Sequence, residues 1–357
     1  PAPSPSGRSP EAVGRTGRSV RSMKIDAGLL VPPPLLHERA EALAATGVDG
    51  LFTFEGSHDV FFPLVLAAHT GCDLYTNVAI AFPRSPMHLA HQAWDLAQLS
   101  DGRFSLGLGS QVKAHVERRY GATWSSPVER MGEWVHALRA IYARWQDGVP
   151  LAFEGEHTRH TLMTMAFDPG PLSCGPPPIW LGALGPKMVT LAASVADGLL
   201  IHPFTSDRHL AEVTLPRVEA ARAEAGRARG DLTLVGQSVV ACSSDPARQA
   251  ELDTAARWNI GFYGSTPAYA AVLETEDRAA IHPELRRLSR EGRWDEMAAL
   301  VDDDLLDAVV LRGDPETVAR RLVARYGATA DRVALSTPGG ITDEDLTALV
   351  AVVRSLT

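Results

Sequence analysis

The sequence predicts an α/β fold, a (β/α)8 TIM barrel with insertions, from three observations. Short apolar segments alternate with amphipathic helical patterns along most of the 357 residues. About eight of these apolar segments can be counted, which is the number of strands that closes this barrel. They are short and largely apolar, as expected for a parallel sheet that is buried on both faces. The dinucleotide-binding alternative lacks its G-x-G-x-x-G signature, since "GLGSQV" at 107–112 has only two glycines.

The strands are expected wherever four to eight apolar residues lie between turn signals. The first is "KIDAGLL" and the last is "RVALST". In chain order, strands are predicted at 24–30, 48–54, 74–82, 104–109, 178–182, 196–202, 231–241 and 332–337.

The helices are expected from apolar residues at helical spacing and from capping signals. In 35–47, Leu36, Ala40 and Leu43 form one apolar face. Asp314 before Pro315 is a helix start, and Thr342 with Asp345 predicts a capping box. The remaining helices are predicted at 61–69, 88–100, 128–145 and 246–258, with one more between the fifth and sixth strands.

The predicted domain organisation is one barrel preceded by an extension. Residues 1–22 are rich in Pro, Ser, Gly and Arg and carry a net charge of +3, from four arginines and one glutamate. They are expected to be a disordered basic extension, because they have almost no large apolar side chains to bury. Residues 23–357 are predicted to be a single barrel domain, with insertions at about 147–176 and 260–306.

Composition excludes several classes of function. The net charge is −9, which argues against nucleic acid as a partner, and no run of about 20 apolar residues predicts a membrane span. The three cysteines, at 72, 174 and 242, form neither a disulfide framework nor a zinc-binding spacing. We therefore expect a cytoplasmic protein that acts on a small molecule.

The segment "IWLGALGPKM" at 179–188 ends a buried strand in exposed backbone rather than in a polar turn. In a barrel of this type, ligands bind where strands end. A glycine-flanked helix start there leaves N–H groups that attract anions. Gly182 and Gly185 therefore indicate an anion-binding turn, and a tight turn with no ligand is the alternative.

Two longer stretches indicate a class of function. "LAHQAWDLAQLSDGRFSLGLGS" followed by "PPPIWLGALGPKMVTLAASVADGLL" resembles the luciferase-like monooxygenase superfamily, closest to the F420-dependent oxidoreductase branch of actinobacteria. The resemblance extends from about residue 24 to 351. It implies a homodimeric barrel enzyme that transfers a hydride between coenzyme F420, a deazaflavin, and an unidentified organic substrate. The alternatives are an FMN-dependent monooxygenase and a barrel that binds the deazaflavin without catalysis.

The resemblance also implies positions for the cofactor. The isoalloxazine-like ring would lie beside a bulge with a non-prolyl cis bond, which would fall at Ala79–Ile80. Glu55 would hydrogen-bond the cofactor, and the phosphate end would be held by the loop after the fifth strand. The full set of implied cofactor-binding residues is Glu55, Ala79, Ile80, Phe82, Leu108, Gly109, Lys113, Gly182, Leu184, Gly185, Lys187 and Met188.

The catalytic residues depart from the family pattern. The positions where relatives keep their acid and base hold Gly56 and Ser110. His58 and Asp59, two and three residues further along, are predicted to be a shifted acid–base pair. The alternative is that His58 caps the next helix or is solvated. His202, at the end of the sixth strand, is the rival catalytic histidine.

We expect no metal site. His88 and His91 are spaced i and i+3, as are His157 and His160, but neither pair has a cysteine or a second acidic ligand nearby in the sequence.

Overall fold

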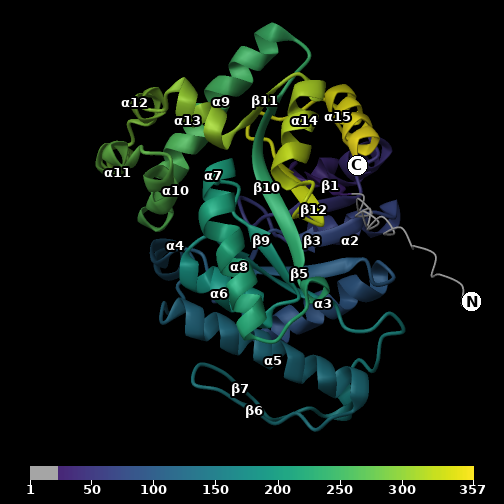
Figure 1. Ribbon diagram of the computed structural model, residues 1–357. Coiled ribbons are helices and arrows are strands. Elements are labelled where there is room, and N and C mark those ends of the chain that lie inside the picture. The colour runs from purple at the N-terminus through teal and green to yellow at the C-terminus, as the bar shows by residue number, and fades with distance from the viewer. Residues whose placement is uncertain (1–22) are drawn as a thin grey trace, which may run out of the picture.

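The computed structural model describes residues 23–357, and the prediction for residues 1–22 lies outside them. Eight parallel strands form a closed barrel, so the predicted fold class is confirmed (Figure 1). Around the barrel the order is β10-β12-β1-β2-β3-β5-β8-β9, and β9 pairs with β10 to close it. The strands are β1 (Lys24–Gly28), β2 (Gly50–Thr53), β3 (Asp73–Thr76), β5 (Phe104–Gly109), β8 (Ile179–Ala183), β9 (Gly198–Ile201), β10 (Thr233–Cys242) and β12 (Arg332–Ser336).

Helices surround this barrel. Those that follow the strands are α1 (Leu36–Ala45), α2 (Phe62–Ala67), α3 (Pro86–Leu99), α4 (Lys113–Arg118), α5 (Pro127–Asp147), α6 (Pro186–Val195), α7 (Asp207–His209), α8 (Leu215–Glu224), α9 (Pro246–Gly264), α14 (Pro315–Tyr326) and α15 (Asp343–Leu356). The Asp314 carboxylate caps α14 by accepting from Thr317 N at 2.8 Å, as predicted. Thr342 likewise caps α15. The Asp345 carboxylate accepts from the Thr342 hydroxyl at 2.9 Å and from Ser244, rather than from the Thr342 backbone N–H that the predicted capping box requires.

The barrel interior has its own core, separate from the layer between strands and helices. Its buried members are Phe52, Tyr75, Trp180, Leu200, Val235 and Ala334. Below them, toward the amino ends of the strands, the Asp26 carboxylate accepts from Arg332 at 2.6 and 2.7 Å. The Arg332 guanidinium lies 5.3 Å from the ring centre of Tyr75 and 5.7 Å from that of Trp180. A buried ion pair therefore occupies the end of the barrel at which its strands begin.

The segment 147–176 leaves the barrel after α5. It carries a small hairpin of β6 (Phe153–Glu154) and β7 (Arg159–His160). The carboxylate of Glu133 in α5 holds this hairpin by accepting from the backbone N–H groups of residues 156, 157 and 158 at 2.7 to 3.1 Å.

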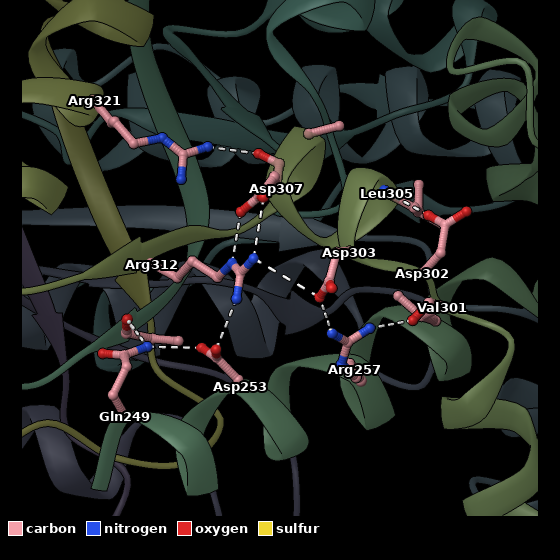
Figure 2. A network of polar contacts seen from close by, with 12 residues as sticks. Gln249, Asp253, Arg257, Val301, Asp302, Asp303, Leu305, Asp307, Arg312 and Arg321 are labelled. Carbon is pink, nitrogen blue, oxygen red and sulfur yellow. Dashed lines mark hydrogen bonds and ion pairs between the residues drawn. The ribbon is translucent and has the colours of Figure 1, made fainter. Parts of the chain in front are cut away.

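The segment 260–306 forms helices that pack beside α9 (Figure 1). They are α10 (Ala270–Thr275), α11 (His282–Glu291), α12 (Trp294–Ala299) and α13 (Asp303–Val309), followed by β11 (Leu311–Gly313). Figure 2 shows Arg312 of β11 between carboxylates of two helices, with Asp253 of α9 at 2.8 Å and Asp307 of α13 at 2.6 Å. These charges join the helices of this segment to the barrel, since β11 pairs with β10.

Candidate functional site

The carboxyl ends of the eight strands lie at one edge of the barrel, because all eight are parallel. The predicted strand at 74–82 is two strands here, β3 and β4 (Ala79–Ile80), and the chain breaks between them. The non-prolyl cis peptide lies in that break, at Asn77–Val78. The prediction that it falls at Ala79–Ile80 is therefore wrong by two residues, because those two residues pair with β5.

The Glu55 carboxylate joins three segments at this edge. It accepts from Ile80 N at 2.8 Å, from Arg84 Nη1 at 2.7 Å and from the Tyr120 hydroxyl at 2.9 Å. Its side chain is only 7% exposed. Burial, and then the hydrogen bond to Glu55, raises the pKa of Tyr120, so the phenol stays a neutral donor. Glu55 therefore fixes β4 against the loops that follow β2 and β5.

Two of the predicted cofactor glycines make room for a protein side chain. A Cβ at Gly109 would lie 2.4 Å from Val78 Cγ2, and one at Gly182 would lie 2.9 Å from Val78 Cγ1. Val78 follows the cis peptide, so both glycines allow the break in the β3–β4 segment to pack against β5 and β8. Gly185 differs, because a Cβ there would meet no protein atom within 4 Å.

A pair of amides crosses the barrel at its mouth. Asn77 Nδ2 donates to Gln237 Oε1 at 2.9 Å, and Gln237 Nε2 donates to Asn77 Oδ1 at 3.1 Å. Asn77 follows β3 and Gln237 lies on β10, and these strands are on opposite sides of the closed barrel. The pair therefore spans the barrel above its apolar core. The predicted strands at 74–82 and 231–241 contain these two residues, but the sequence did not link them, because only barrel closure brings the two together.

His202 lies just beyond β9 between two tyrosines of the inserted region. Its ring centre is 4.9 Å from that of Tyr263 and 4.4 Å from that of Tyr269. Burial lowers the pKa of His202 to about 3. Its Nδ1 accepts from Phe204 N at 3.1 Å. The imidazole is therefore neutral at ordinary pH and carries its proton on Nε2, which makes it a hydrogen-bond donor rather than an acid.

The predicted His58–Asp59 pair does not form. The Asp59 carboxylate instead accepts from Phe61 N at 2.7 Å and from Phe62 N at 3.0 Å, at the start of α2. His58 is exposed, and within residues 23–357 its imidazole has no hydrogen-bond or ion-pair partner. Asp59 caps the helix, the role that the alternative gave to His58, and the imidazole is left free in the loop after β2.

Helix α6 begins at this edge without a side-chain cap. Gly185 is its N-cap residue and Pro186 has no N–H to satisfy, so within residues 23–357 the N–H groups of Lys187 and Met188 have no capping side chain. Helices α3, α9, α14 and α15 are each capped by a Ser, Asp or Thr side chain, whereas α1, α5 and α8, like α6, are not. The Lys187 side chain is exposed and has no ion-pair partner within the described part of the chain. This arrangement can hold an anion.

The other predicted cofactor residues lie in the cores, in β4 or on the exposed face of α4. Phe82 is 3% exposed and packs in the core, where Arg130 lies 4.4 Å from its ring centre. Leu108 belongs to the layer between strands and helices. Lys113 lies 3.8 Å from Glu117 on the exposed face of α4. Leu184 packs on the core of the inserted helices. Ala79 and Ile80 are buried in β4, and Met188 packs against the main core.

The spaced histidine pairs make local contacts. The His88 Nδ1 lies 3.2 Å from Ser85 Oγ, and the His91 ring is tilted by 42° against that of Trp145 with centres 4.7 Å apart. The His160 Nε2 lies 2.9 Å from Thr158 Oγ1. In residues 23–357 neither pair belongs to a group of three metal-ligating side chains.

Comparison with solved structures supports this barrel. The coenzyme F420-dependent tetrahydromethanopterin reductase of Methanopyrus kandleri matches with a TM-score of 0.77 at 19% identity, covering 94% of this chain and 99% of that one. The oxygenating constituent of 3,6-diketocamphane monooxygenase from Pseudomonas putida, in complex with FMN, matches with a TM-score of 0.65 at 17% identity. That match covers 93% of this chain and 98% of the monooxygenase chain.

Sequence comparison gives the family. An uncharacterized protein of Mycobacterium tuberculosis (strain ATCC 25618 / H37Rv) is 43% identical over 315 residues, covering 88% of this chain and 93% of the relative. The 5,10-methylenetetrahydromethanopterin reductase of Archaeoglobus fulgidus is 30% identical over 263 residues, covering 72% and 74%. The model of the luciferase-like monooxygenase family matches residues 22–332. Within residues 23–357, no helix has the length and apolar character to cross a bilayer. The chain belongs to the luciferase-like monooxygenase family.

Proposed function

We propose that this protein is an oxidoreductase that uses coenzyme F420 to transfer a hydride to or from an organic small molecule. The observation that carries the proposal is the start of α6 at the carboxyl edge of the barrel, which has no side-chain cap. Beside it lies Lys187, whose side chain has no ion-pair partner in residues 23–357. A structural neighbour whose name states F420 dependence supports the choice of cofactor, and a relative named as a 5,10-methylenetetrahydromethanopterin reductase supports an oxidoreductase.

The residues present fit such a cofactor. The two open N–H groups of α6 and the Lys187 ammonium suit its phosphate, and Gly185 leaves room for it. Each amide of the Asn77–Gln237 pair has a second N–H and a second oxygen lone pair free of this contact. These groups can bind a polar ring that lies on the pair. When bound, the deazaflavin supplies the hydride donor or acceptor.

The protein side chains then have distinct roles in the proposal. Glu55 holds β4, which would form one wall beside the ring. His202 orients the substrate through its Nε2–H, since its low pKa prevents it from taking up a second proton at neutral pH. His58, which is exposed at the same edge and has no hydrogen-bond or ion-pair partner in residues 23–357, moves the proton that accompanies hydride transfer.

FMN-dependent monooxygenation is the second candidate, because a structural neighbour binds FMN. A barrel that binds the deazaflavin without turnover is the third, because Gly56 and Ser110 replace the usual acid and base.

We expect F420 to bind more tightly than FMN. Arg118 is exposed and has no ion-pair partner in residues 23–357, so its guanidinium is available to the anionic tail of F420. Absorbance titration of the purified protein with each cofactor measures this. FMN that co-purifies in stoichiometric amount and resists displacement by F420 would contradict it.

Gly185→Asp is expected to weaken cofactor binding roughly 10- to 150-fold, the equivalent of one charge-assisted hydrogen bond of about 1.5–3 kcal/mol. The new carboxylate would occupy the space for the phosphate and repel it. The fold should survive, because a Cβ at Gly185 meets no protein atom within 4 Å. The measurement is the Kd for F420 in the same titration.

Gly230→Asp is the matched control. Gly230 is equally open and precedes β10, at the amino end of the strands, so its substitution should leave the Kd unchanged. If the folded Gly185→Asp variant and the wild type bind F420 with equal affinity, the phosphate does not bind at this loop.

A further inference from the structure

Two histidines and a glutamate converge on the outer surface, away from the residues described above. His37 and Glu41 lie one turn apart on α1, and His69 comes from the short 3-10 helix η2 (Ala68–Thr70) that follows α2. One ligand atom from each lies within 4.8 Å of the others, and this is the group of three or more potential metal ligands found in residues 23–357. From these residues we propose a surface site for a divalent zinc-class cation.

The separations within the group favour a metal over direct hydrogen bonds. Glu41 Oε1 is 3.6 Å from His37 Nε2 and 3.5 Å from His69 Nε2. Both distances exceed the usual hydrogen-bond range of about 2.7–3.2 Å. Two ligands at the corners of a tetrahedron around Zn²⁺, with bonds of about 2.0–2.1 Å, lie about 3.4 Å apart. The two observed distances therefore match the separation of two ligands that share one ion.

The chemistry of the three ligands sets the class of ion. Two imidazoles and one carboxylate suit zinc and neighbouring transition metals, whereas calcium and magnesium prefer sites made of oxygen alone. Three protein ligands leave the fourth tetrahedral position to water. The side chains are 46–63% exposed, so a hydrated ion can reach them.

The site has no competing partner. Within the described residues, none of the three side chains has a hydrogen bond or ion pair outside the group. The two imidazole rings lie with their centres 4.8 Å apart and their planes at 31°. A bound ion would join α1 to the chain that follows α2, so zinc should raise the thermal unfolding midpoint by mass action.

The test is calorimetric titration of the full chain with ZnCl₂, after removal of any histidine tag. Cys174 is an exposed thiol that could bind zinc by itself, so Cys174→Ser serves as the background. One equivalent of zinc is expected to bind per chain. Co²⁺ should give the visible absorption of a tetrahedral site, and the unfolding midpoint should rise with zinc.

His37→Ala, His69→Ala and Glu41→Gln should each weaken zinc binding roughly tenfold or more and abolish the rise in the midpoint. All three positions are exposed, so the variants should keep the fold. His136→Ala, an exposed histidine on α5, is the control and should bind as the background does. Absence of binding to the background protein, or equal binding by all the variants, would overturn the proposal.

Discussion

Asp26→Ala is expected to lower the free energy of unfolding by about 3–5 kcal/mol, the usual cost of leaving one member of a buried ion pair alone. The side chains of Asp26 and Arg332 are 0% and 7% exposed. The alanine variant would leave the guanidinium inside the barrel, where its remaining carboxylate partner is Asp73 at 3.0 Å. Urea unfolding monitored by circular dichroism measures the loss.

Two further variants separate this effect from a general effect of losing charge. Glu154→Ala removes an exposed pair with Arg159 and should cost less than about 1 kcal/mol. Replacing both buried partners, Asp26→Leu with Arg332→Met, should recover part of the stability because no charge is then left unpaired. A loss in Asp26→Ala no larger than that in Glu154→Ala would show that water reaches the pair.

His58→Ala is expected to lower kcat by about 10²–10⁴, the range typical of a positioned acid or base. Cofactor affinity should stay nearly unchanged, because the imidazole has no partner among the described residues and Asp59, not His58, caps α2. The measurement is the absorbance change of F420 with a substrate found by screening candidate alcohols and carbonyl compounds. The Kd for F420 is measured on the same samples.

His202→Ala provides the contrast. If His202 is a neutral donor that orients the substrate, its removal should raise KM more than it changes kcat. His136→Ala, far along α5, should alter neither constant. A large loss of kcat at His202 with none at His58 would move proton transfer to the other side of the barrel mouth.

Most of the fold could be predicted from local sequence patterns. All eight barrel strands and the caps at Asp314 and Thr342 follow from apolar runs and from residue types that act within a few positions. The helices α7 and α8 and the strand β11 were missed. Strand β11 has three residues and is defined by its pairing with β10, so it has no periodicity of its own to detect.

The sequence pointed to some residues of the candidate site but not to the contacts that hold them. The resemblance led to Glu55 and to the turn before α6, but Glu55 is held by Arg84 and Tyr120, which the sequence did not link to it. Gly109 and Gly182 were predicted to lie beside a cofactor, and in the structure both also leave room for Val78. A glycine in a sequence shows that something approaches the backbone closely, but it does not show what.

The sequence by itself determined the barrel, because periodicity and caps are local properties of the chain, and its resemblance to known relatives indicated the family. The carboxyl ends of the strands as the place where a ligand binds remain a prediction from the sequence. Only the tertiary structure decided the amide pair of Asn77 with Gln237, the protonation of His202 and the group of His37, Glu41 and His69. Asn77 and Gln237 are 160 positions apart, and closure of the barrel brings them within 2.9 Å. The state of a titratable group depends on how far its neighbours remove it from water, which is fixed only when distant segments pack together.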